Sequence, residues 1–257
     1  NPYTLRQVRD QSMFFGRNEE IERILDHLRN GNTFIVLYGQ KRIGKTSLIY
    51  QLADNLIPQT YDILPVNFDA HRLSSFDTIP FMLALANATH KKLEERLRRG
   101  EDRRGLRLRE SSLKDDPFGG FAQWVRKVEE QLQGTKLLFM IDEFTRAEEE
   151  FERGRLDPAF FDGMQYLVGN ADIGFLVCVH DYVYLEGSRS WGMLQRGQPI
   201  RLNALDRESA ARLVRQPLER LYRFDNHLVE NILDLTDCHP YFIQAICQSL
   251  ITHMSQK

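Results

Sequence analysis

One short stretch constrains this chain more than any other, because it fits a phosphate-binding loop at every fixed position. Residues 39–46 read Gly-Gln-Lys-Arg-Ile-Gly-Lys-Thr, which satisfies the pattern G-x-x-x-x-G-K-S/T. The apolar residues 33–38 predict a buried strand before the loop, and residues 46–56 predict a helix after it. A phosphate-binding loop requires this order of strand, loop and helix, so we interpret the stretch as a nucleotide site rather than a chance glycine-rich turn.

The residue types of this loop explain how it would hold phosphate. Gly39 and Gly44 let the backbone curl so that successive N–H groups point at phosphate oxygens, and the helix that follows adds its positive N-terminal dipole. Lys45 can reach the β- and γ-phosphates, and the Thr46 hydroxyl can ligate Mg²⁺. Lys41 is interpreted as a solvated loop charge. The predicted nucleotide contacts of the loop are Gly39, Gln40, Arg42, Ile43, Gly44, Lys45, Thr46 and Ser47.

A second stretch supplies two acids at the end of an apolar run. Residues 136–143 predict a buried strand that ends in Asp142 and Glu143, and ligands of open parallel sheets bind at that end of a strand. Asp142 is the natural Mg²⁺ partner of Thr46, directly or through water. Glu143 is the natural base for an attacking water, so Lys45 and Glu143 are the predicted catalytic residues. Such a run could also be a helix cap, but its place after a phosphate loop favours the functional interpretation.

Alternating strand and helix patterns predict an α/β core with a parallel five-stranded sheet and helices on both faces. From Leu205 onward the sequence changes to helices with short connections. We therefore expect a core of residues 1–203, in which residues 1–32 form an N-terminal segment and helix, and a helical lid of residues 204–257. The predicted strands are residues 33–38, 63–69, 136–143, 174–180 and 198–202.

Four local features lead to more specific expectations. Asn18 is expected to cap the first helix, and Pro58 to end the helix after the phosphate loop. The mixed charges of residues 146–155 indicate a solvated segment. Residues 187–197 are expected to form a surface loop, whose two arginines, Arg189 and Arg196, are candidates to act on a neighbour's nucleotide.

The composition of the chain limits which partners it can bind and indicates the cellular compartment in which it works. The 257 residues, 42% of them hydrophobic, suffice for one large core, and the net charge of −2 predicts no overall affinity for nucleic acid. The three cysteines form no disulfide framework, so we expect a cytoplasmic protein. Together with His239 and His253 they form no paired metal-binding motif. No apolar run is long enough to span a membrane. Because the chain starts at Asn1, we expect a module of a longer protein whose effector or sensor domains are missing here.

A short box near the start of the chain and the phosphate loop together resemble the corresponding motifs of a known group of ATPases. The box Phe15-Gly16-Arg17-x-x-Glu20-Ile21, followed by a helix and by residues 36–48, resembles the STAND class of signal-transduction ATPases, and also the archaeal-type ATPases and the origin-recognition initiators. The resemblance implies the strand order 5-1-4-3-2 and nucleotide contacts from Phe15, Gly16 and Arg17. The acidic pair places the chain in the ATPase branch, and no guanine-reading motif is present.

The resemblance also assigns roles to two further positions, at which this sequence has other residues than are usual in those families. In those families the residue at the end of the fourth strand senses the γ-phosphate; here it is His180, where Ser, Thr, Asn or Arg is more usual, and a satisfied histidine at a strand end is an alternative. Cys238-His239-Pro240 resembles the lid motif Gly-x-Pro, which implies that Pro240 packs near the base and that His239 approaches the phosphates. A proline also suits a helix start in any protein.

The favoured hypothesis is an ATP-binding switch with Mg²⁺-dependent ATPase capacity, in which ATP or ADP lies between core and lid. Its nucleotide state would control self-association and an effector on the missing flanks. One alternative is a DNA-associated ATPase, supported by residues 91–110, which hold nine Lys or Arg and five Asp or Glu. The near-neutral total charge does not favour it. Another alternative is a scaffold that holds ADP without hydrolysis. The unusual residue His180 at the sensor position is compatible with this alternative.

Overall fold

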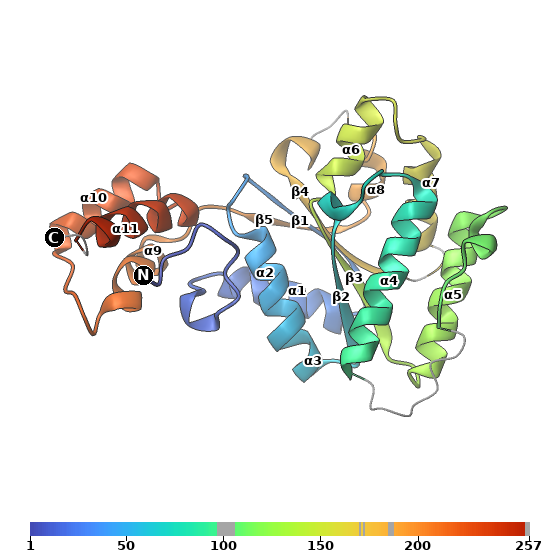
Figure 1. The fold of residues 1–257 in the computed structure, drawn as a ribbon, viewed down its shortest axis with the longest axis horizontal. Coiled ribbons are helices and arrows are strands. Elements are labelled where there is room, and N and C mark those ends of the chain that lie inside the picture. The colour runs from blue at the N-terminus through green and yellow to red at the C-terminus, as the bar shows by residue number, and fades with distance from the viewer. Residues whose placement is uncertain (97–105, 170, 172, 185–187, 255–257) are drawn as a thin grey trace.

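The computed structural model describes residues 1–96, 106–169, 171, 173–184 and 188–254. Figure 1 shows an α/β body joined to a smaller helical body, and both chain ends lie at the helical body. Residues 97–105, the middle of the basic segment 91–110 on which the DNA-binding alternative rests, lie outside the described residues. No helix in the described ranges is long and apolar enough to cross a membrane.

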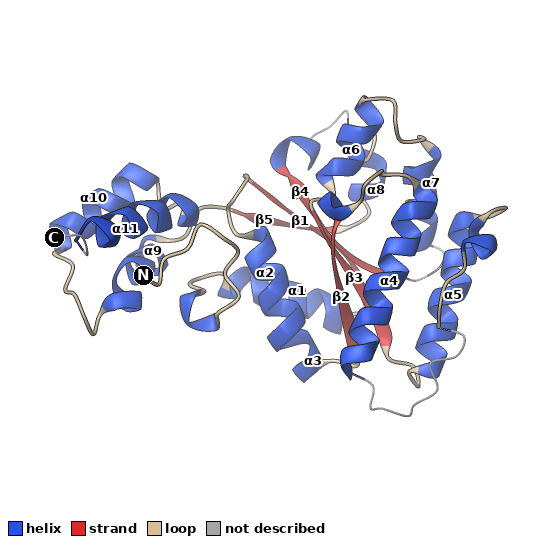
Figure 2. Ribbon diagram, viewed as in Figure 1, coloured by secondary structure: helices blue, strands red, loops and turns tan. Residues whose placement is uncertain are grey.

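The α/β body is built on five parallel strands in the order β2-β3-β4-β1-β5 (Figure 2). This confirms the predicted fold class and strand order. The phosphate loop follows the strand β1, which lies between β4 and β5, and the acidic pair follows β3. The strands are β1 (Phe34–Gly39), β2 (Ile63–Asp69), β3 (Lys136–Asp142), β4 (Gly174–His180) and β5 (Gln198–Leu202).

Helices cover both faces of the sheet because successive strand residues point to opposite sides. Ile35 and Leu37 of β1 pack with α1 and α2, whereas Phe34 and Val36 belong to the larger core with α4, α5 and α7. The helices of this body are α1 (Asn18–Arg29), α2 (Lys45–Gln51), α3 (Ile57–Thr60), α4 (Thr78–Arg96), α5 (Pro117–Gln131), α6 (Thr145–Glu152), α7 (Ala159–Gly169) and α8 (Trp191–Leu194). Short 3-10 turns are Gln11–Met13, Ala70–Arg72, Glu110–Leu113, Asp181–Tyr184 and Gln216–Leu218.

The helical body has its own apolar core, formed by α9 (Arg207–Arg215), α10 (Asn226–Thr236) and α11 (Pro240–Met254). Two residues from the start of the chain, Tyr3 and Phe15, are buried in the same core. The Tyr3 hydroxyl donates to the carbonyl of Val214 at 2.5 Å. The N-terminal segment is therefore packed against the lid, although it is distant from the lid in sequence.

Two expectations about helix ends were wrong. The N-cap of α1 is Arg17, in the left-handed region at φ 71°, and Asn18 is the first helical residue. Pro58 does not end the helix after the phosphate loop: a π-helical turn, Leu52–Leu56, leads into α3, where the proline lies in the first turn. Proline is tolerated there because the N–H that it lacks has no partner within the helix.

The expected solvated segment 146–155 and surface loop 187–197 are both more ordered than predicted. Residues 145–152 form α6, in which Glu148 is buried and accepts the backbone N–H groups of Arg189 and Ser190 at 2.6 and 2.9 Å. The helix α8 then buries apolar side chains in the main core. A carboxylate that receives two N–H donors can be buried, so the charge pattern alone was misleading.

Candidate functional site

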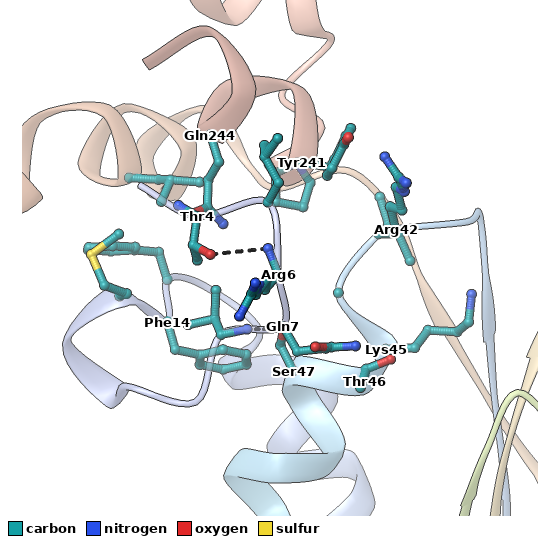
Figure 3. Close-up of a pocket in the computed structure, with 18 of the residues that line it drawn as sticks. Thr4, Arg6, Gln7, Phe14, Arg42, Lys45, Thr46, Ser47, Tyr241 and Gln244 are labelled. Atoms are coloured by element: carbon teal, nitrogen blue, oxygen red, sulfur yellow. Dashed lines mark hydrogen bonds between the residues drawn. The ribbon is translucent and has the colours of Figure 1, made fainter. Parts of the chain in front are cut away.

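A cavity of about 320 Å³ opens where the phosphate loop, the N-terminal segment and α11 of the lid meet (Figure 3). The loop contributes residues 41–47, the N-terminal segment contributes residues 4–8, and the lid contributes Pro240, Tyr241 and Gln244. Glu143, at the end of the third strand, also lines the cavity. The lining combines polar groups from all three segments with the apolar side chains of Met13, Phe14, Phe15, Leu205 and Leu213.

Lys45 occupies the centre of the phosphate loop. Its Nζ donates to the carbonyls of Gly39 and Gln40 at 2.8 and 2.9 Å, which uses two of the three ammonium protons. Burial lowers the pKa of Lys45, and the charges of Asp142 and Glu143 partly oppose this. The ammonium is therefore held where the loop curls, with one donor left for a phosphate oxygen.

Thr46 and Asp142 meet as the two motifs predicted. The Thr46 hydroxyl donates to Oδ2 of Asp142 at 2.6 Å. Burial raises the pKa of Asp142, and the hydrogen bond from Thr46 opposes that shift. A hydroxyl and a carboxylate side by side are oxygen donors of the kind that Mg²⁺ takes. Within the described ranges no group of three His, Cys, Asp or Glu is placed to hold a metal ion by itself.

Glu143 has an unusual backbone conformation next to this pair. Its φ is 53°, in the left-handed region, and its N–H donates to Oδ1 of Asp142 at 3.1 Å. A left-handed residue with a side chain costs roughly 1–2 kcal/mol, and such strain is concentrated at functional sites. The conformation turns the chain sharply after β3, and the Glu143 side chain reaches the cavity.

His180 lies against Glu143. Its Nε2 is 3.4 Å from Oε2 of Glu143, and its backbone N–H donates to the Thr145 hydroxyl at 2.8 Å. Burial lowers the pKa of His180, and the charges of Lys45 and Lys41 lower it further, so the ring is neutral at neutral pH. Among the side chains that the structure describes, Nε2 is a buried atom with no hydrogen-bond partner. The structure thus brings the candidate sensor and the candidate base together.

The Gly-Arg box lies beside the loop rather than across the cavity. The buried Arg17 guanidinium donates to the carbonyl of Ile43 at 3.0 Å and pairs with Glu20 at 3.1 Å. Phe15 and Arg17 line the cavity. Gly16 has φ 69° and lies where a side chain would approach Leu205 and Ser209 of the lid. Whether these residues touch nucleotide remains a prediction; their visible contacts support the loop and the lid.

The residues of the lid motif Cys238-His239-Pro240 lie in different surroundings. Pro240 lines the cavity, whereas the His239 ring packs on Phe242 at 4.8 Å between centroids. Burial lowers the pKa of His239, and a hydrogen bond with the backbone of Lys41 partly offsets this. Cys238 takes φ 55°, a conformation that glycine adopts at no cost, which accounts for glycine at this position of the motif that the sequence resembles.

Residues 4–8 of the N-terminal segment were not predicted to belong to the site, although they line the cavity. The backbone N–H of Val8 donates to the Ser47 hydroxyl at 2.9 Å, and that of Thr4 donates to the side-chain oxygen of Gln244 at 3.0 Å. These residues show no periodicity, and their partners lie about 40 and 240 positions away. The two candidate arginines of residues 187–197 do not line the cavity, and Arg189 pairs with Asp162 at 3.2 Å.

Fold and site together define a P-loop ATPase domain: a parallel sheet with the order β2-β3-β4-β1-β5, a phosphate loop after β1, and an Asp-Glu pair after β3. The chain belongs to the family described as ATPase domains predominantly from Archaea, whose model matches residues 14–246. A search of curated proteins found no match.

Solved structures agree with this fold. A Walker-type ATPase of Pyrococcus abyssi superposes with a TM-score of 0.69 at 13% identity, covering 96% of this chain and 70% of that one. The Cdc6 protein of Pyrobaculum aerophilum gives 0.57 at 14% identity (98% and 63% covered), and the Aeropyrum pernix Orc1 protein, solved in complex with DNA, gives 0.56 at 12% (97% and 62%). The chain thus spans less than two thirds of either initiator. At these identities the likeness shows the fold alone.

Two histidines of the site, the partly buried His180 and the buried His239, predict a pH dependence of stability. Since the pKa values of His180 and His239 lie below the ordinary value, the folded protein binds fewer protons than the unfolded chain. Their contribution is present above about pH 6.5 and is lost as the pH falls through the lowered pKa. Each histidine adds at most about 1.4 kcal/mol per pH unit to the slope, and partial exposure reduces this.

We expect the urea midpoint to fall between pH 7 and pH 5, and His180→Gln and His239→Gln each to flatten that fall. His253→Gln, at an exposed position of α11, is the control and should leave the slope as in the wild type. An unchanged slope in both site variants would contradict the assignment of neutral rings.

Proposed function

We propose that this chain is an ATP-binding and ATP-hydrolysing switch of the STAND type, in which nucleotide controls the arrangement of core and lid. The observation that carries the proposal is the composition of the cavity wall. The phosphate loop and Glu143 come from the core, whereas Pro240, Tyr241 and Gln244 come from the lid. A ligand in this cavity would touch both bodies, so gain or loss of its γ-phosphate would alter contacts between them.

The residues of the site suit phosphoryl transfer to water. The loop backbone and Lys45 would bind the β- and γ-phosphates, and Glu143 would orient the attacking water and accept its proton. Thr46 and Asp142 would hold Mg²⁺, which when bound neutralises the developing charge on the phosphate oxygens. His180, whose Nε2 lies 3.4 Å from Oε2 of Glu143, would limit the positions that this carboxylate can take.

Calorimetry with ATP and Mg²⁺, together with a phosphate-release assay, tests this directly. We expect saturable binding of one nucleotide per chain and a slow release of phosphate that stops when EDTA removes the metal. Self-association should then be followed by light scattering with ADP and with ATP, since a switch requires the two to differ. A folded protein that binds neither nucleotide would exclude the proposal.

Two other functions are candidates for this chain. A DNA-associated ATPase is one of them, since an Orc1 protein solved with DNA shares this fold, and a salt-dependent gel shift would favour it. The contact of His180 with Glu143 supports a scaffold that retains ADP, because a carboxylate engaged by a ring is less free to activate water. Nucleotide extracted from purified protein, with its exchange rate, separates the scaffold from the switch.

A further inference from the structure

The phosphate loop touches the lid through an arginine and an aromatic ring. The guanidinium carbon of Arg42 lies 4.2 Å from the centroid of the Tyr241 ring, well within the range of a cation–π contact. Arg42 belongs to the loop and has φ 64°, whereas Tyr241 lies in the first turn of α11. Figure 3 shows the two side chains at the same side of the cavity, which both of them line.

The ring is the visible partner of this arginine. Among the residues that the structure describes, the contact recorded for the Arg42 guanidinium is the one with the Tyr241 ring. An arginine stacks on a ring with its face and keeps its N–H donors at the edge. Arg42 can therefore hold the Tyr241 ring and a phosphate oxygen at the same time.

The same helix face also reaches the other end of the cavity. Gln244 follows Tyr241 by three residues, which places both on one side of α11. The side-chain oxygen of Gln244 accepts the N–H of Thr4 in the N-terminal segment at 3.0 Å. One face of α11 thus contacts the phosphate loop at one end of the cavity and the N-terminal segment at the other.

We propose that Tyr241 is a positioning residue, whose ring holds the Arg42 guanidinium at the phosphate end of the cavity and thereby ties the phosphate loop to the lid. The inference rests on the proposed nucleotide-binding function and adds a role in retention. With the contact made, loop and lid enclose the nucleotide as one unit. Release then requires the contact to open, so the rate of nucleotide release depends on the ring.

Stopped-flow release of a methylanthraniloyl-labelled ADP, chased with unlabelled ADP, tests the role. We expect Tyr241→Leu and Arg42→Ala each to raise the release rate about fivefold, in the range of a partly exposed cation–π contact. Tyr241→Phe keeps the ring and should release at the wild-type rate. Tyr166→Leu, at an exposed position of α7, is the matched control outside the site. The double variant should release no faster than Arg42→Ala alone, because the ring acts through the guanidinium that this substitution removes.

Two results would overturn the inference. One is wild-type release from Tyr241→Leu; the other is a double variant whose effect is the product of the single effects. If the wild type binds no labelled ADP, the proposed function fails instead. Amide hydrogen exchange in the first turn of α11, measured without nucleotide, then tests the contact between Arg42 and Tyr241 independently. Faster exchange in Tyr241→Leu and Arg42→Ala than in the wild type supports a contact that ties the loop to the lid, and unchanged exchange refutes it.

Discussion

Replacing Lys45 with alanine is expected to weaken ATP binding at least about 100-fold, because charge-assisted hydrogen bonds to phosphate are among the strongest a protein makes. Lys45 is buried at the centre of the loop, and its ammonium has a donor left after its bonds to the carbonyls of Gly39 and Gln40. The affinity is measured by calorimetry with ATP and Mg²⁺.

Two controls make the result specific to the ammonium. Lys127→Ala removes an exposed lysine of α5 and should bind ATP as the wild type does. Lys41→Ala tests the interpretation of Lys41 as a solvated loop charge and should change the affinity far less than Lys45→Ala. Thermal unfolding of Lys45→Ala should show a cooperative transition, since the variant removes a charge whose burial is unfavourable. Unimpaired ATP binding by a folded Lys45→Ala protein would refute the assigned phosphate site.

Glu143→Gln is expected to lower the rate of hydrolysis by about 100-fold or more while ATP binding stays within about threefold of the wild type. A carboxylate that accepts the proton of the attacking water contributes about 10²–10⁴-fold, and an amide of the same shape cannot accept that proton. The other predicted contacts to phosphate come from the loop, which the substitution leaves unchanged. Phosphate release in single-turnover conditions measures the chemical step without the contribution of product release.

Glu152→Gln, at an exposed position of α6, is the matched carboxylate control and should hydrolyse ATP at the wild-type rate. If Glu143→Gln turns ATP over as fast as the wild type, the base lies elsewhere and the contact with His180 has a structural meaning only. If neither the wild type nor the variant hydrolyses bound ATP, the scaffold that retains ADP becomes the better account.

The elements that were predicted correctly share a local cause. The strands β2 to β4 are largely apolar runs, whereas β5 alternates buried and exposed residues, and all four have the predicted bounds to within one residue. The loop after β1 and the acids after β3 came from fixed spacings, and the parallel sheet brings Thr46 and Asp142 within 2.6 Å. The strand order was not predicted from spacing; it followed from the resemblance to known ATPases.

The elements that were predicted wrongly depend on contacts between distant residues. The charges of residues 146–155 looked solvated, yet Glu148 is buried because two N–H groups of the segment before α8 satisfy it. The N-terminal segment has no pattern of its own, yet it lies between α2 and the lid because Ser47 and Gln244 accept its N–H groups. No local periodicity records such partners.

The amino-acid sequence by itself determined that this chain carries a phosphate loop, a buried strand ending in two acids, and alternating elements for a parallel sheet, because each depends on residues within one turn or one strand. Only the tertiary structure decided that Arg17 supports the loop backbone, that His180 meets Glu143, and that Tyr241 meets Arg42. Each of these contacts joins two elements whose distance is set by the packing of the whole domain.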